Sequence, residues 1–413
     1  MRRLAWGLLI AFAFAVPWEY SLDLGAPWGN VARILGLALL LATVPAVLEN
    51  GGFRRPGPMQ GLVLALYCWF CVSYFWTISR EATLQELRAY FQELMIVWLV
   101  WELVETPRDL RTLMRALLLG CWVLAILTYM DFSSPGAIAA GEYRFAAYGQ
   151  DPNDVARFLD LGFPMAALLA RSGAGWIDRF FGYAYLPAAL IAVVLTASRG
   201  GFLAAGAALT GSLVLLSRGR SRGTLAALLA LPPLAAFLWY LIPYETLARL
   251  ATIPEQLHNG DLNQRLDIWA AGWDAWVRAP WAGSGAGTFV QAAHLAQIDT
   301  AHNTALSIAV AGGLWALLLA VCILICAVYS ACCARGILRI AFVATLAVWA
   351  ISSMVGTVEE NRITWLFFGM AAVLGSFAKE AQAALDDAFP NAPAPKRTNV
   401  LGKFANADGD AAR

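Results

Sequence analysis

Long runs of hydrophobic residues, separated by polar connections, extend from the start of the chain to about residue 380. Each run is roughly 15–25 residues long, which suits the ~20 helical residues that cross a bilayer. Lipid cannot satisfy open backbone groups, so each run is predicted to be a helix. The pattern predicts about twelve spans, at residues 4–17, 30–48, 60–78, 88–104, 110–130, 154–171, 180–198, 201–217, 224–243, 303–330, 337–356 and 362–378.

Two polar connections are long, at about residues 131–153 and 244–302. The second contains the segment Arg265–Arg278, which reads as an amphipathic helix lying in the membrane interface. One face of that helix would carry, at helical spacing, Leu266, Trp269, Trp273, Trp276 and Val277. From about residue 380 the chain is polar and rich in Ala, Pro and Asn. We therefore expect one transmembrane domain over 1–379 and a disordered tail over 380–413.

The composition agrees with this pattern and excludes an ordinary soluble protein. Hydrophobic residues make up 60% of the chain and charged residues only 14%. Every second connection is basic, beginning with Arg2 and Arg3, which by the positive-inside rule places both termini in the cytoplasm. The two long connections then face outside. The basic connections hold Arg54, Arg55, Arg108, Arg111, Arg115, Arg171, Arg179, Arg218, Arg220, Arg222, Arg335 and Arg339.

Arginines on the outer face are not explained by topology, and they indicate an anionic ligand such as a phosphate or pyrophosphate. The outer set is Arg80, Arg144, Arg199, Arg249, Arg265, Arg278 and Arg362. Arg199 lies in a tight turn with Gly200 and Gly201, where backbone can approach a ligand closely. Arg265 opens the interfacial helix. The alternative is that these side chains only reach lipid head groups.

His302 lies at the start of the tenth span, with Asp299 or Thr300 available as the helix cap. The positive end of a helix disfavours imidazolium, and a neutral imidazole can act as a general base. A purely structural polar residue at a helix end is the alternative. The nearby His258 and His294 do not complete a zinc spacing, so no metal site is predicted.

Three other polar motifs have structural explanations. Asp151 or Asn153 can cap the sixth span, and Arg157 and Asp160 inside it can pair with each other. The run 283–287 (GSGAG) resembles a phosphate-cradling loop, but it follows a helix and lacks the lysine of a nucleotide-binding loop. A tight turn is therefore favoured there, and neither nucleotide nor nucleic acid is predicted to bind.

A base and several arginines on the outer face suit transfer from a lipid pyrophosphate. The leaving group develops negative charge that arginines can stabilise, while the base removes the proton of an acceptor hydroxyl. Nucleotide sugars are absent outside the cytoplasm, so a lipid-linked donor is expected. Arginines can neutralise the pyrophosphate, so the chemistry requires no metal or other cofactor.

Three blocks of sequence resemble the O-antigen ligases and their relatives in bacterial surface polysaccharide assembly. The first is 148–156 (YGQDPNDVA), similar to a G-x-x-x-P-N-x-x-A loop of the family. The second is 195–202 (LTASRGGF), similar to its S-R-G-G turn. The third, 265–314, holds R-x-x-x-W, then PWAGSGAGTF, then HNTAL. With the span count, the resemblance covers nearly the whole chain.

The resemblance implies a GT-C-type glycosyltransferase in the bacterial inner membrane, with its active site facing the periplasm. Its donor would be an undecaprenyl-pyrophosphate-linked glycan, its acceptor lipid A–core, and its mechanism inverting and metal-independent. His302 matches the family's catalytic histidine, and Arg199 and Arg265 match arginines that bind the donor pyrophosphate. Further candidates for the site are Arg80, Arg144, Asp151, Asn153 and Asn303.

Alternatives to a ligase remain. An O-antigen polymerase or a protein oligosaccharyltransferase of the same superfamily would differ only in the acceptor. A transporter or flippase would suit twelve spans, but ionisable residues cluster at one face and hardly occur at mid-membrane, where a transport site is expected.

Overall fold

The protein is built from helices. Its structure, a computed structural model, describes residues 1–25, 28–49, 51–134, 143–172, 175–218, 233, 236–237, 240–258, 260–296 and 300–380. Within these ranges the one extended pairing is an isolated antiparallel bridge between Asp23 and Asn30. Apart from Glu380, which ends a helix, the predicted tail, 380–413, lies outside the described residues, as does most of the predicted ninth span, 224–243.

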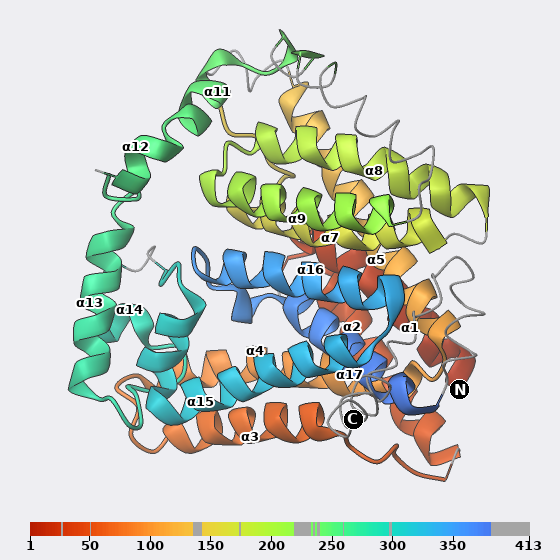
Figure 1. Ribbon diagram of the computed structural model, residues 1–413. Coiled ribbons are helices and arrows are strands. Elements are labelled where there is room, and N and C mark those ends of the chain that lie inside the picture. The colour runs from red at the N-terminus through yellow and green to blue at the C-terminus, as the bar shows by residue number, and fades with distance from the viewer. Residues whose placement is uncertain are drawn as a thin grey trace, which may run out of the picture.

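The long helices form a bundle that runs across Figure 1. They are α1 (Arg2–Ala15), α2 (Val31–Glu49), α3 (Pro58–Ser73), α4 (Arg80–Leu103), α5 (Pro107–Phe132), α7 (Pro152–Ser172), α8 (Trp176–Leu195), α9 (Arg199–Ser217), α15 (Thr304–Cys333), α16 (Gly336–Ser353) and α17 (Arg362–Glu380). The shorter ones are η1 (Val16–Ser21), α11 (Tyr244–Ala251), α12 (Ile253–His258), α13 (Arg265–Arg278), α14 (Phe289–Ala292) and η2 (Val358–Glu360).

Every predicted span except the ninth coincides with one long helix. Seven of the described helices are long and apolar enough to cross a membrane, and α3 and the apolar part of α17 are shorter. The prediction of an all-α, multi-pass membrane protein is therefore confirmed. The count of twelve spans and the GT-C fold remain predictions.

Connections predicted to share one side of the membrane do meet at one end of the bundle. Arg54 donates hydrogen bonds to the carbonyl oxygens of Trp101 (3.0 Å) and Val104 (3.4 Å). Arg2 pairs with Glu105 at 2.6 Å. These contacts join the N-terminus, the α2–α3 connection and the α4–α5 connection, which are the basic ones.

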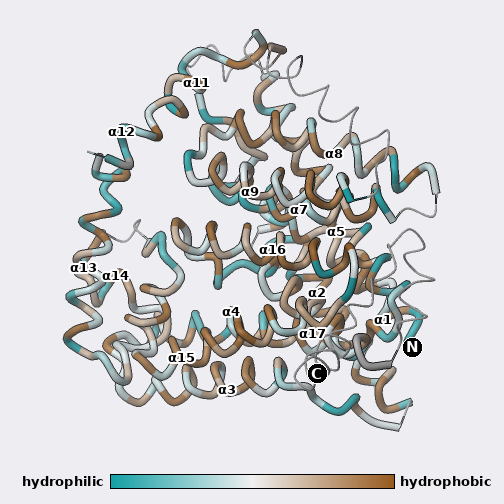
Figure 2. Tube along the Cα trace, viewed as in Figure 1, coloured by the Kyte–Doolittle hydropathy of each residue, from teal (hydrophilic) through white to brown (hydrophobic). Residues whose placement is uncertain are grey.

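The remaining connections gather at the opposite end, which we call the site end. The backbone N–H of Ile78 donates to Ser284 at 3.1 Å, and Asn303 donates to the carbonyl of Met354 at 3.4 Å. Helices α11 to α14 lie along this end, at the left of Figure 1. Figure 2 shows them as more hydrophilic than the bundle. The alternation inferred from charge is thus present in the fold.

Side-chain caps define where several helices begin at the site end. Ser79 accepts from the N–H of Ala82 at α4 (3.4 Å), and Ser198 accepts from the N–H of Gly201 at α9 (3.2 Å). Each cap satisfies a backbone N–H that has no partner within its helix. These starts are important because the site residues lie on or beside them.

Helix α7 is the centre of the bundle and packs against α5, α8, α9 and α16. It is buried along nearly all of its length, including its charged residues Arg157 and Asp160. The predicted pairing of those two is wrong, because Arg157 forms its ion pair with Asp154, one turn earlier. Asp160 is fully buried, and its carboxylate oxygens have no hydrogen-bond partner in the described structure.

The glycine-rich run 283–287 is a structural turn, as the favoured interpretation had it. The N–H groups of Ser284 and Gly285 donate to the carbonyls of Val310 (2.8 Å) and Ala311 (2.9 Å) in α15. Just beyond, α15 breaks its helical geometry at Gly313, with φ 66° and ψ −162°. The run 283–287 is therefore hydrogen-bonded to α15 two turns after the start of that helix, and it helps to position the preceding residue His302.

The predicted interfacial helix is present with the predicted bounds, Arg265–Arg278. The face that this helix buries against the rest of the protein, however, is centred on Ile268, Gly272 and Ala275. Trp269 and Trp276 pack against this apolar cluster, so the predicted face is divided. Of the five residues predicted for the apolar face, three are exposed: Leu266, Trp273 and Val277.

Candidate functional site

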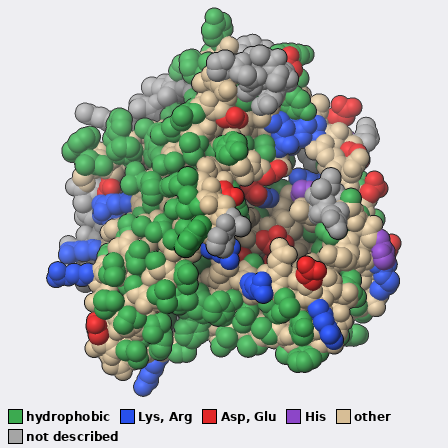
Figure 3. Space-filling view, turned by 180° about the vertical axis from the view of Figure 1, so that it is seen from behind, with side chains coloured by type: hydrophobic (Ala, Val, Ile, Leu, Met, Phe, Trp, Pro, Cys, Tyr) green, Lys and Arg blue, Asp and Glu red, His purple; other side chains and the backbone are tan. Residues whose placement is uncertain are grey.

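A polar cavity of about 560 Å³ lies at the site end, between α7, the start of α13, the start of α15 and the segment before α17. Figure 3 shows charged and histidine side chains gathered around a hollow on a largely hydrophobic face. The cavity is lined by Tyr20, Arg144, Asp151, Asn153, Asp154, Arg157, Asn263, Arg265, Thr300, His302, Thr357, Glu360 and Asn361. All three blocks of sequence that resemble the O-antigen ligases contribute residues to this cavity or to a smaller one that adjoins it.

Asn153 joins two of these blocks. Its side-chain oxygen accepts hydrogen bonds from Arg144 (3.1 Å) and from the hydroxyl of Ser198 (2.9 Å). Gly201 follows in the same turn as Ser198, and a Cβ there would collide with Ala156 of α7. The second glycine of the S-R-G-G turn therefore allows α9 to pack tightly on the helix that carries Asn153.

Asp151 has the capping role that was one of its two interpretations. Its carboxylate accepts from the N–H of Asn153 at 2.7 Å, and its carbonyl accepts from the N–H of Val155 at 3.0 Å. Just before it, Gly149 has φ 74°, and a Cβ there would meet the carbonyl of Tyr20. This glycine therefore allows η1 to close one wall of the cavity.

Arg265 follows three consecutive residues in the left-handed region, at φ 52°, 60° and 63°. Non-glycine residues rarely adopt that conformation, and such strain concentrates at functional sites. Within the described residues, the guanidinium of Arg265 makes no hydrogen bond or ion pair. It lies in the cavity as a cation whose donors remain available to a ligand.

Arg199 lies in an adjoining cavity of about 100 Å³, which shares Asn153, Asn263 and Arg265 with the larger one. Unlike Arg265, it is held by three acceptors. It donates to the carbonyl of Arg249 (3.3 Å), to the side chain of Asn263 (3.0 Å) and to the hydroxyl of Thr252 (2.7 Å). Arg199 and Arg265 thus face the same region from two sides of Asn263.

Arginines crowd this corner of the site. Burial lowers the pKa of Arg265; the charge of Asp151 raises this pKa, and the charges of Arg144, Arg199 and Arg249 lower it. Burial and the charge of Arg249 likewise lower the pKa of Arg144. An anionic ligand would relieve this repulsion, so the arrangement suits a phosphate-bearing group.

His302 itself has a left-handed backbone, with φ 46°, and is half-buried at the cavity wall. Two neighbours hold it there. The indole N–H of Trp269, one turn after Arg265 in α13, donates to the carbonyl of Ala301 at 3.1 Å. On the other side Asn303 caps α15 by accepting from the N–H of Leu306 at 3.0 Å.

The cap of α15 is therefore Asn303, and not Thr300 as the sequence suggested; Asp299 lies outside the described residues. Asn303 is absent from the cavity lining, although the sequence made it a candidate there. Arg80 is also elsewhere: it is exposed at the start of α4, 5.7 Å from the ring centre of Tyr74. Among the weaker candidates, the structure brings together Arg144, Asp151 and Asn153.

The segment 357–361 is the part of the site that sequence reasoning missed. Glu360 lines the cavity, where its side chain is exposed to solvent beside the buried Glu359. Thr304 ties this segment to α15, since its hydroxyl donates to Gly356 (2.9 Å) and accepts from the N–H of Val358 (2.9 Å). The sequence feature that could have indicated this segment is the pair Glu359 and Glu360 close to the outer Arg362.

In the ranges that the structure describes, no three His, Cys, Asp or Glu side chains are grouped to hold a metal ion. The side chains that line the cavity supply an imidazole for proton transfer and guanidinium groups for anions.

A family model described as O-antigen ligase matches residues 184–321. The match begins inside α8, covers α9 and α11 to α14, and ends inside α15, and so it includes Arg199, Arg265 and His302. No curated protein matches the chain.

Proposed function

From the match of residues 184–321 to the O-antigen ligase family model, we propose that the chain transfers an O-antigen glycan to lipid A–core. The donor is the glycan linked to undecaprenyl pyrophosphate, and the acceptor is a sugar hydroxyl of the core. The reaction takes place at the periplasmic face of the bacterial inner membrane, with the site end of the bundle facing the periplasm. Both termini then lie in the cytoplasm.

His302 is the general base of this proposal. Its imidazole takes the proton from the acceptor hydroxyl as that oxygen attacks the anomeric carbon of the donor sugar. The bond from the anomeric carbon to the pyrophosphate oxygen breaks, and its electron pair leaves with undecaprenyl pyrophosphate. Attack from the face opposite the leaving group inverts the anomeric configuration.

Arg265 and Arg199 bind the leaving pyrophosphate. Guanidinium groups match phosphate oxygens through paired hydrogen bonds and stabilise the charge that develops as the bond breaks. Arg199 comes with its donors already aligned by fixed acceptors. Arg265 contributes donors that have no partner within the described residues.

The observation that carries the proposal is the sharing of one cavity by Arg265 and His302. They come from separate parts of the third block, 37 positions apart by their numbers 265 and 302. Trp269, on the same helix as Arg265, also bonds to the residue before His302. A base and an anion site are thereby held by one small structural unit.

The test is glycan transfer by the purified protein with undecaprenyl-pyrophosphate glycan and lipid A–core, without added metal. The variants are His302→Ala and, as a matched control, His294→Ala. His294 also has a left-handed backbone but does not line the cavity. Transfer by wild type and the control, with none by His302→Ala, is the expected result.

The products separate the remaining possibilities. Lengthening of the donor glycan without transfer to lipid A–core would make the protein a polymerase. Transfer to a protein acceptor alone would make it an oligosaccharyltransferase. No product of any kind from a folded protein would overturn the proposed function.

A further inference from the structure

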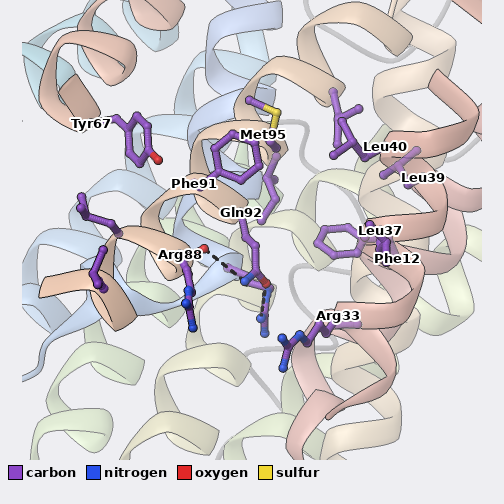
Figure 4. A pocket seen from close by; sticks show the side chains of 17 residues that line it. Phe12, Arg33, Leu37, Leu39, Leu40, Tyr67, Arg88, Phe91, Gln92 and Met95 are labelled. Atoms are coloured by element: carbon purple, nitrogen blue, oxygen red, sulfur yellow. Dashed lines mark hydrogen bonds between the residues drawn. The ribbon is translucent and has the colours of Figure 1, made fainter. Parts of the chain in front are cut away.

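A second cavity, of about 590 Å³, lies between α1, α2, α3, α4 and α17 (Figure 4). We call it the lipid groove. Its walls are mostly apolar and include Phe12, Leu39, Leu40, Phe91, Met95 and Leu99. Leu37 and Phe91 remain 59% and 41% exposed, so the groove opens on the outer surface of the bundle. In a membrane this opening faces lipid.

One end of the groove is cationic. Arg33, Arg88 and Arg362 line it, and all three lie in the half of their helix that is nearer the site end. In Figure 4 the labelled Arg33, Arg88 and Gln92 lie at one end, whereas Met95 and Leu40 lie at the other. The groove therefore has the polarity of an amphiphile: an apolar body with positive charge at one end.

Two of these charges are not neutralised by the protein. Arg362 pairs with Glu19 and donates to Gln92 at 3.0 Å. By contrast, the side chains of Arg33 and Arg88 are exposed and form no hydrogen bond or ion pair within the described residues. Guanidinium groups at the mouth of an apolar groove favour a phosphate-bearing head group.

The groove ends beside the candidate site. Arg362 directly follows Glu360 and Asn361, which line the polar cavity, and its partner Glu19 directly precedes Tyr20, which also lines it. By contrast, α9 and α13, which carry the two arginines proposed for the donor pyrophosphate, contribute no residue to the groove. A lipid held in the groove would approach His302 from a different wall than the donor pyrophosphate.

We propose that the lipid groove binds the acylated, phosphorylated lipid of the acceptor. Its acyl chain fills the apolar part, its head-group phosphate binds Arg33 and Arg88, and its sugars extend past Arg362 into the polar cavity. This inference rests on the proposed function for the identity of the acceptor. It gives the two lipid substrates separate phosphate sites on either side of His302.

The kinetic test compares the double variant Arg33→Gln/Arg88→Gln with Arg80→Gln, in nanodiscs of zwitterionic lipid. Arg80 is a matched control: it is exposed on α4, like Arg88, but does not line the groove. The double variant should raise the KM for the acceptor about tenfold and leave the KM for the donor within twofold. Arg80→Gln should behave as wild type.

Two kinetic results would overturn the proposal. An unchanged acceptor KM would show that the groove does not contact the acceptor. A rise in the donor KM of the same size would assign the groove to the donor lipid instead. Because both arginines are exposed and have no partner among the described residues, the double variant should fold normally, and an unchanged melting temperature checks this.

A binding experiment separates failure of this inference from failure of the proposed function. Lipid A without core sugars is added to wild type, the double variant and His302→Ala, and bound lipid is counted by native mass spectrometry. Wild type and His302→Ala should bind it alike, and the double variant about tenfold more weakly. Removing the phosphates from the lipid should abolish this difference; equal binding by all three proteins would overturn the groove even if transfer activity is found.

Discussion

The substitution Arg265→Gln removes a guanidinium group that makes no hydrogen bond or ion pair with the described residues. At this group, the favourable charge of Asp151 is opposed by those of three neighbouring arginines. Removing it therefore breaks no internal contact. We expect the melting temperature to stay within about 2 °C of wild type or to rise, since surface-type substitutions change stability by about 0.5 kcal/mol or less.

Its effect on transfer should be large. Hydrogen bonds to a charged group contribute about 1.5–3 kcal/mol, and each 1.4 kcal/mol is a factor of ten. The loss of one guanidinium contact to the pyrophosphate should lower kcat/KM about 10- to 150-fold. Arg265→Lys keeps the charge but not the paired donors, so it should lie between wild type and Arg265→Gln.

Arg199→Gln is the informative contrast. It removes the same kind of charge but also three hydrogen bonds, to Arg249, Asn263 and Thr252. At about 1 kcal/mol for each bond, this variant should lose stability as well as activity. The assay is initial-rate glycan transfer at varied donor concentration, paired with thermal unfolding of each variant in the same detergent.

Either of two results would contradict the proposed role of Arg265. If Arg265→Gln keeps wild-type kcat/KM, this guanidinium does not bind the donor. If it unfolds as early as Arg199→Gln, its side chain has a structural role that the contacts do not account for.

Three further predictions follow from single features of the fold. His302→Ala should lower kcat about 10²- to 10⁴-fold with little change in donor KM, as expected for loss of a general base. Gly313→Ala should destabilise the protein by about 1–3 kcal/mol in a denaturant titration, because φ is 66° there and a Cβ would meet the backbone of Trp281 and Ala282. Glu86 precedes the predicted span 88–104, and burial, aided by the charge of Glu359, raises its pKa to about 7. Its folded pKa exceeds the unfolded value, so wild type loses stability as pH rises from about 4.5 through 7, and Glu86→Gln should gain melting temperature relative to wild type over that window.

Each has its control. Gly206→Ala, in α9 with open space around the position, should not destabilise the protein; if it does so as much as Gly313→Ala, backbone strain is not the cause. A melting-temperature difference between Glu86→Gln and wild type that is constant from pH 4 to 8 would contradict the raised pKa. A His302→Ala variant whose donor KM rises while kcat is kept would make that residue a binding group.

The sequence alone determined the helices, their order and the two ends of the bundle. Hydrophobic runs and the fixed thickness of a bilayer are local constraints, and charge in each connection reports its side without knowledge of packing. The same holds for α13, whose bounds followed from helical spacing. Its buried face did not, because the residues it packs against, such as Phe289, lie elsewhere in the chain.

Only the tertiary structure decided which outer arginines share a site. Charge placed Arg80, Arg144 and Arg265 on one face equally, yet Arg144 and Arg265 line the polar cavity and Arg80 does not. The lipid groove was also hidden, because Arg33, Arg88 and Arg362 lie on three helices far apart in sequence. Such groupings depend on which helices are neighbours in the bundle, and hydrophobic periodicity does not specify those neighbours.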